Sequence, residues 1–235
     1  MKVESIKTSY YNSTNFTGNR ISKISQKISV KDFAFNSEPE EFKALRKIYD
    51  DFWKKLSIFK NLKPNLEYNK MKADMAFSFQ DYTIYVNKNI SPFRMNIRNK
   101  SGKNTAMLRH EIEHLFQRWM IIRLLGAEEY CDIWNYPNSE VKMKSLKKAK
   151  EIEKTLGRVS ADSPEGIVAK LFLEACVNYP ELKFSSNIFD IKEIIQYHKY
   201  KNNFIELCAD EAAKSFEPSL LKKIKVAIEE FIKLF

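Results

Sequence analysis

The chain contains few of the residues that interrupt regular structure, with only 5 glycines and 7 prolines among its 235 residues. This scarcity excludes collagen-like chains and low-complexity segments rich in glycine and proline. Hydrophobic residues make up 44% of the chain and aromatic residues 13%, which is enough apolar material for a core. The length suits one compact domain, or two small lobes around a shared cleft. We therefore expect a folded globular protein.

Long apolar segments are also missing. The longest runs, residues 119–122 and 124–127, are separated by Arg123 and fall far short of the roughly 20 residues that a membrane-spanning helix needs. The first residues lack the apolar segment and the cleavage site of a secretory signal peptide. We predict no membrane span, no signal peptide and a cytoplasmic location. Residues 1–28 are polar and aperiodic, which predicts a disordered leader and leaves export by a non-Sec route open.

Cysteine is scarce as well. The three cysteines are odd in number and show no CxxC spacing, which argues against a disulfide framework and against a zinc site made of thiolates. They are Cys131, Cys176 and Cys208. We therefore expect these thiols to be unpaired.

Positive charge is unevenly distributed along the chain. Lysine and arginine number 40 against 30 aspartates and glutamates, a net charge of +10, and residues 1–104 hold 20 basic and 10 acidic side chains and so carry the whole excess. A positive field favours acidic partners by long-range attraction. The lysine spacing shows neither a groove-reading helix nor an aromatic stacking motif, so nucleic acid is not an expected partner.

Hydrophobic periodicity predicts a mostly helical chain with a small N-terminal sheet. An amphipathic helix is expected over residues 38–59, followed by two short strands, residues 75–80 and 83–87, rich in aromatic and β-branched side chains. Residues 87–102 include Pro92, Gly102 and several polar side chains and are predicted to be a loop. Further helices are expected over residues 105–125, 128–134, 139–156, 164–178, 190–200, 204–216 and 218–234.

These elements predict an α+β fold in a single domain, residues 29–235. The sheet and the first helices would form an N-terminal lobe that extends to about residue 126. Residues 127–235 would form a helical C-terminal lobe. An active site between the two lobes would then draw residues from both.

The strongest helical pattern, residues 105–125, contains the sequence His-Glu-x-x-His. His110 and His114 are four residues apart, so on a helix they lie on one face, one turn apart, and can meet a single tetrahedral metal ion. Glu111 lies beside that metal and can take a proton from a bound water. A shuffled chain of this composition would contain the motif only about 0.002 times. We therefore predict Zn²⁺ as a cofactor.

A catalytic zinc ion needs a third protein ligand and one open position for water. A metzincin would have a glycine and a histidine where this chain has Gln117 and Met120, which excludes that class. The downstream candidates for the third ligand are Glu128, Glu129, Glu140, His198 and Glu206.

Glu206 is the best match, because it begins the sequence Glu-Leu-Cys-Ala-Asp of residues 206–210. Here the chain resembles the gluzincin peptidases, in which one helix carries HExxH and a later helix carries ExxAD, as in neprilysin-like enzymes and the CAAX-prenyl endopeptidase family. The resemblance implies a zincin-like fold with Glu206 as the third zinc ligand and Asp210 as a supporting residue. The spacing agrees, because Glu206 and Asp210 are one turn apart and Asp210 can accept an N–H from a zinc-bound imidazole.

Three further parts of the chain are expected to contribute to this site. Gln117 lies one turn beyond His114 and is expected to support it. Tyr197 and His198, just ahead of Glu206, are candidates to donate a hydrogen bond to the oxyanion of peptide hydrolysis. By analogy with zincins, residues 83–87 are expected to offer a strand edge to an extended peptide.

The sequence thus predicts a zinc-dependent metallopeptidase that acts on a peptide or protein substrate, with acidic substrates favoured by the charge. His110, His114 and Glu206 would hold the metal and Glu111 would be the general base. The alternative is a basic helical binding or regulatory protein that keeps a structural or inactive metal site. A catalytic site leaves one position open to water, whereas a structural site is closed by a fourth protein ligand.

Overall fold

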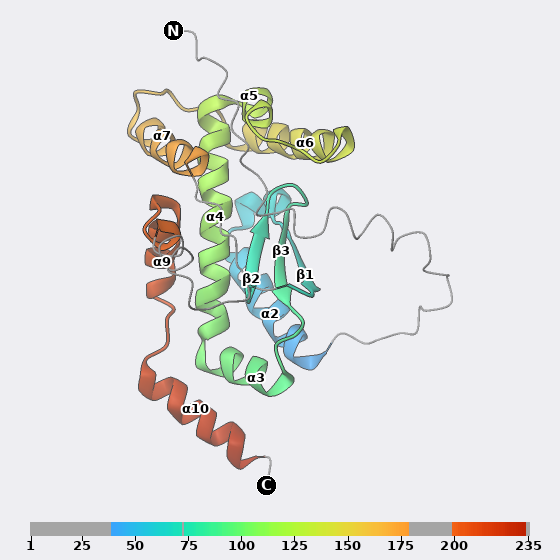
Figure 1. Ribbon diagram of the computed structural model, residues 1–235, viewed down its shortest axis with the longest axis vertical. Coiled ribbons are helices and arrows are strands. Elements are labelled where there is room, and N and C mark those ends of the chain that lie inside the picture. The colour runs from blue at the N-terminus through green and yellow to red at the C-terminus, as the bar shows by residue number, and fades with distance from the viewer. Residues whose placement is uncertain (1–38, 72, 179–198, 234–235) are drawn as a thin grey trace, which may run out of the picture.

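The computed structural model describes residues 39–71, 73–178 and 199–233, and this part of the chain is mostly helical with one small sheet (Figure 1). The predicted α+β class is therefore confirmed. The predicted leader, residues 1–28, lies outside the described residues. The same is true of the predicted helix 190–200 up to residue 198.

The helices follow the predicted pattern closely in the second half of the chain. They are α2 (Glu40–Lys55), the 3-10 helix η1 (Ser57–Leu62), α3 (Pro92–Ser101), α4 (Lys103–Leu125), α5 (Ala127–Asp132), α6 (Ser139–Leu156), α7 (Pro164–Val177), α9 (Phe204–Lys214) and α10 (Leu220–Ile232). The strands are β1 (Asn65–Asn69), β2 (Met75–Ser78) and β3 (Thr83–Asn87). The first helix ends earlier than predicted, because the chain leaves α-helical geometry after Lys55 and continues as η1.

Side-chain caps explain why the later helices begin where they do. Asn138, Ser163, Asn203 and Ser219 each accept a backbone N–H from the first turn of the helix that follows. A short polar side chain at this position satisfies one of the N–H groups that have no partner inside the helix. The cap at Asn203 matters most for function, because it sets the start of α9.

The strands form one mixed sheet in the order β1-β3-β2. β3 pairs with β1 in parallel and with β2 antiparallel, so residues 83–87 form the central strand. The expectation that these residues offer an open edge is therefore wrong. The error comes from β1, which the sequence did not predict because Leu66 is its only fully buried residue and polar residues surround it. β2 is the edge strand that lies next to α4.

The predicted loop at residues 87–102 is also wrong, because most of it forms α3. Ser91 caps this helix by accepting the N–H of Arg94, and Pro92 occupies its first turn. Gly102 ends it with a left-handed backbone, at a φ of 95°. Proline and glycine, which suggested a loop, instead mark the start and the end of a short helix.

The long helix α4 lies at the centre of the fold (Figure 1). One side packs against β2 and α2, and another packs against α7 and α9. Leu108, Ile112, Leu115 and Ile122 are buried along it and belong to the main hydrophobic core. Because burial against several neighbours restricts the helix, its polar face is held in a fixed position. His110 and His114 lie on that face.

Among residues 39–71, 73–178 and 199–233, no helix combines the length and the apolar character needed to cross a membrane. The longest helix of this part, α4, carries Arg109, Glu111 and Arg123 among its apolar residues.

Candidate metal centre

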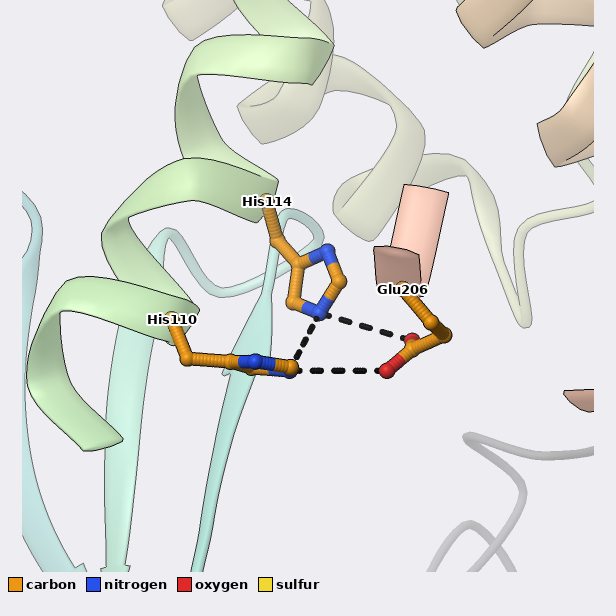
Figure 2. Close-up of side chains that lie close together, drawn as sticks. All are labelled: His110, His114 and Glu206. Carbon is orange, nitrogen blue, oxygen red and sulfur yellow. Dashed lines mark hydrogen bonds and ion pairs between the residues drawn. The ribbon is translucent and has the colours of Figure 1, made fainter. Parts of the chain in front are cut away.

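Two histidines project from the same face of α4, one turn apart (Figure 2). The Nε2 atoms of His110 and His114 are 3.1 Å apart. Both rings are partly buried, with side-chain exposures of 16% and 17%. The helix therefore presents two imidazole nitrogens to one point in space, as the four-residue spacing predicts.

Glu206, from the first turn of α9, faces the two imidazoles (Figure 2). Its carboxylate oxygens lie 3.4 Å from His110 Nε2 and 3.5 Å from His114 Nε2. The residue follows His114 by 92 positions in the chain, and the packing of α9 against α4 brings the two together. The predicted ligand set is thus assembled in space from two separate helices.

The spacing of the three donors fits a tetrahedral zinc ion. Ligand atoms at 2.0–2.1 Å from such an ion lie about 3.3–3.4 Å from one another. The two nitrogens are 3.1 Å apart, and each lies 3.4 or 3.5 Å from a different oxygen of the Glu206 carboxylate, which are separations close to that value. Imidazole nitrogen and carboxylate oxygen are also a donor set that zinc accepts. Within the described residues, one group of histidine and carboxylate side chains could hold a metal ion, and it consists of His110, His114 and Glu206.

Each imidazole is held by a second polar group at its other nitrogen. His110 Nδ1 lies 3.0 Å from Asp210 Oδ1, and His114 Nδ1 lies 3.1 Å from Gln117 Oε1. A hydrogen bond from Nδ1–H to oxygen leaves the lone pair on Nε2, the atom that faces the other donors. Asp210 and Gln117 therefore occupy the supporting places expected from the sequence.

Gln117 also links the two helices that build the centre. Its Nε2 donates to the backbone carbonyl of Ile205 at 2.9 Å, and its side chain is almost completely buried. Because a carbonyl only accepts hydrogen bonds, this contact fixes which end of the amide is nitrogen. The amide oxygen must then face His114 and accept its Nδ1–H. One side chain thus sets the tautomer of His114 and the position of α9 beside it.

Gln117→Leu should lower zinc affinity by about 10- to 100-fold, the range for losing a residue that supports a metal ligand. Leucine keeps the volume of the buried side chain but neither accepts from His114 nor donates to Ile205. Competition of the variant with a zinc-binding dye measures the affinity. Arg118→Leu, at the next position of the same helix, is the control. Equal affinities for Gln117→Leu and wild type would remove Gln117 from the centre.

Glu111 points toward the edge of the sheet. Its Oε2 accepts the backbone N–H of Phe77 in β2 at 2.9 Å, and the residue is buried. The sequence did not indicate this contact, because Phe77 precedes Glu111 by 34 positions and lies on a strand. This hydrogen bond holds the Glu111 carboxylate against β2, so the side chain has a defined orientation.

The surroundings of His110 favour a positive charge. Burial opposes protonation, but a hydrogen bond to Glu206 and the charges of Glu111, Glu206 and Asp210 outweigh it and raise the pKa of His110 above its ordinary value. Three carboxylates around one imidazole are therefore arranged to stabilise a cation there. A bound metal ion and a proton would compete for this position.

Zinc affinity should fall with decreasing pH, and the fall should begin above the ordinary histidine pKa of 6.5. The sign follows from linkage: the raised pKa means that the folded, zinc-free protein binds a proton at His110 more readily than the unfolded chain. In the zinc-free protein, the proton bound at His110 stabilises the fold. This stabilisation is full below pH 6.5 and is lost as the pH rises through the raised pKa of His110. Zinc titrations between about pH 5 and pH 8 measure the competition. A zinc affinity that does not change with pH would contradict the competition between zinc and a proton at His110.

Several sequence candidates for the third ligand lie elsewhere. Glu140 is exposed and pairs with Lys144, and Glu128 is exposed and pairs with Lys150. Glu129 is exposed on α5. None of the three belongs to the metal-binding group found among the described residues. Tyr197 and His198 lie outside the described residues, so their predicted roles stay predictions.

Lys201 is a neighbour of the centre that the sequence did not indicate. Its Nζ lies 3.3 Å from Asp210 Oδ2, the carboxylate whose other oxygen faces His110. A lysine nine positions from an aspartate in a lysine-rich chain carries no recognisable signal, since only the turn before α9 brings the two together. The pair holds Asp210 from the side away from the imidazole.

Comparison with known proteins gives no match for this chain, among protein-family models, curated proteins or solved structures. Function must therefore be inferred from the geometry of the centre.

Proposed function

We propose that the protein is a zinc-dependent metallopeptidase with a zincin-like fold of the gluzincin type. The observation that carries the proposal is the meeting of His110, His114 and Glu206, each of which offers a ligand atom within 4.8 Å of the other two. The sequence order supports it, because HExxH lies on one helix and ExxAD on a later one. The supporting contacts of Asp210 and Gln117 also fit a metal centre.

Zinc is the metal that this donor set suits best. Two neutral imidazoles and one carboxylate are a common ligand set of catalytic zinc in hydrolases. When bound, zinc would polarise the scissile carbonyl and lower the pKa of a bound water to about 7. The three ligands are supplied by the chain, and the described residues add no further histidine, cysteine, aspartate or glutamate to the group. This leaves a coordination position for water.

Glu111 is the residue to which we assign the proton transfer. Its Oε2 is engaged by the N–H of Phe77, so Oε1 is the oxygen that would take the proton and pass it to the leaving amine. The hydrogen bond to β2 holds the carboxylate in place before substrate binds, which lowers the cost of organising it during the reaction.

The edge of β2 is the part of the sheet that we assign to substrate. Among the residues that the structure describes, β3 is the one strand that pairs with β2, and the N–H of Phe77 is donated to Glu111. An extended peptide lying along this edge would gain backbone hydrogen bonds with little selectivity for side chains. The scissile bond would then lie beside Glu111. This replaces the role expected for residues 83–87, which form the central strand.

The alternative is a binding or regulatory protein with a structural or inactive metal site. It predicts a centre closed by a fourth protein ligand. The described residues supply three donors, and Asp210, the nearest further carboxylate, contacts the far nitrogen of His110 instead. The geometry therefore favours the peptidase.

The test combines metal analysis with a peptide-library digest. The purified protein should contain about one zinc per chain, cleave peptides, lose this activity with a chelator and regain it when zinc is added back. Purified Glu111→Gln protein serves as the control for contaminating proteases. Protein that contains zinc but cleaves no peptide would favour the structural site, and protein without zinc or cleavage would contradict the proposal.

A further inference from the structure

Asp210, the carboxylate that supports His110, is held at both of its oxygens. Its Oδ1 lies 3.0 Å from His110 Nδ1, and its Oδ2 lies 3.3 Å from Lys201 Nζ. The terminal torsion of an aspartate side chain is broad, so a carboxylate with a single contact can rotate. The side chain of Asp210 is 44% exposed, so water competes for its oxygens. The contact with Lys201 restricts that rotation.

The other imidazole shows the same arrangement. Gln117 accepts from His114 with its amide oxygen, and its amide nitrogen donates to the backbone carbonyl of Ile205. Each supporting side chain therefore bridges an imidazole and an anchor on the protein. The two anchors differ, because Gln117 is buried and bonded to backbone, whereas Asp210 is partly exposed and bonded to a side chain. Lys201 is therefore an anchor that a single substitution removes.

The backbone that carries Lys201 is fixed by Asn203, the cap of α9. The backbone N–H of Asn203 donates to the Tyr200 carbonyl at 3.0 Å, and its side-chain amide donates to the carbonyl of Ala175 in α7 at 3.1 Å. Its side-chain oxygen accepts the N–H of Ile205. The Lys201 ammonium also lies 5.9 Å from the centre of the Tyr200 ring, within the range of a cation–π contact. The lysine side chain therefore starts from a defined position.

The charge of Lys201 by itself opposes a metal ion. A cation beside the centre repels zinc through space. Within the described residues, the ion pair of Lys201 is with Asp210, and the ion pairs of Asp210 are with His110 and Lys201. Lys201 can therefore favour zinc only through Asp210, and this condition sets the sign of each effect to be measured.

We propose that Lys201 is a positioning residue of the metal centre. By holding Asp210 Oδ2, it keeps Oδ1 on the Nδ1–H of His110, so that Nε2 of the same ring stays directed at the metal. The inference rests on the proposed function, because it requires zinc bound by His110. It adds to that function a role for the turn before α9, which then takes part in metal binding.

Competition with a zinc-binding dye measures the effect on affinity. Lys201→Met keeps most of the length of the side chain without its charge and should lower zinc affinity about two- to fivefold, the range for a partly exposed ion pair. Lys201→Arg keeps a cation that can reach the same oxygen and should bind zinc within about twofold of wild type. Lys214→Met is the control and should bind zinc like wild type, because Lys214 lies on α9 and pairs with the exposed Glu211.

A double-mutant cycle with Asp210→Ala tests whether Lys201 acts through Asp210. Asp210→Ala should lower zinc affinity by about 10- to 100-fold. Adding Lys201→Met to Asp210→Ala should leave this affinity unchanged or raise it, because only the repulsion of zinc is then removed. An equal loss of affinity with and without Asp210 would show that Lys201 acts elsewhere and would overturn the proposal.

Proton NMR of zinc-loaded protein with isotope-labelled histidine reports on the Asp210 contact directly. The chain has 3 histidines, so the imidazole N–H signals are few. In Lys201→Met, the Nδ1–H signal of His110 should exchange faster with water, while that of His114 should stay as in wild type. An equal change in both signals, or in neither, would overturn the proposal.

The wild-type titration separates this inference from the proposed function. If wild type binds zinc and Lys201→Met binds it equally well or more tightly, the positioning role is overturned and the proposed function is unaffected. Wild-type protein that binds no zinc would contradict both.

Discussion

Glu111→Gln is expected to retain zinc and the fold but to lower kcat/KM for peptide hydrolysis by about 10²- to 10⁴-fold, the usual contribution of a general base. The glutamine side chain keeps an oxygen that can accept the N–H of Phe77, so the contact with β2 survives. It cannot take a proton from water. Steady-state kinetics on a cleaved peptide, with the zinc content measured on the same sample, gives the result.

Glu113→Gln is the matched control for this variant. Glu113 lies on the same helix two residues later, is partly buried and pairs with Arg109 instead of contacting the centre. The same chemical change there should leave kcat/KM within a few fold of wild type. Activity in Glu111→Gln equal to that of wild type would show that Glu111 is not the base.

Glu206→Ala should lower zinc affinity by more than about 100-fold, the upper limit for losing a residue that only supports a ligand. The side chain is almost completely buried and faces both imidazoles, so its removal leaves two protein donors. The consequence is measurable in stability. Zinc at about 100 times its Kd should stabilise the wild-type protein by about 2.7 kcal/mol and should have little effect on the variant at that concentration.

Glu211→Ala is the control on the same helix, because Glu211 is exposed and pairs with Lys214. Thermal unfolding with and without zinc, together with metal analysis, separates the two variants. Normal zinc content in Glu206→Ala would move the third ligand to another residue, and His198 is then the sequence candidate to test next. Loss of zinc in both variants would point to a general effect on α9.

The sequence predicted the helices well where their ends carry strong local signals. Asn138 and Gly157 bracket α6, and its predicted and observed bounds agree. The same local reasoning failed at α3, because a ten-residue helix with mostly polar residues lacks a clear apolar face. It failed at β1 for a related reason: a strand with one buried side chain is stabilised by its pairing with β3, which lies about 18 residues later.

The candidate centre could be predicted from sequence only where its chemistry follows a short spacing. HExxH places two imidazoles on one face, so the spacing alone was enough to name His110, His114 and Glu111. Glu206 needed a resemblance, since 92 positions separate it from His114. The contact of Phe77 with Glu111 and that of Lys201 with Asp210 had no sequence signal, because both depend on the packing of separate elements.

X-ray absorption spectroscopy at the zinc edge of the purified wild-type protein tests the metal centre most directly. The spectrum should show imidazole scattering from two histidines and a first shell made only of nitrogen and oxygen at about 2.0–2.2 Å. The histidine contribution should diminish in His110→Ala. Sulfur at about 2.3 Å, or a spectrum that is unchanged in His110→Ala, would place zinc elsewhere and contradict a centre formed by α4 and α9.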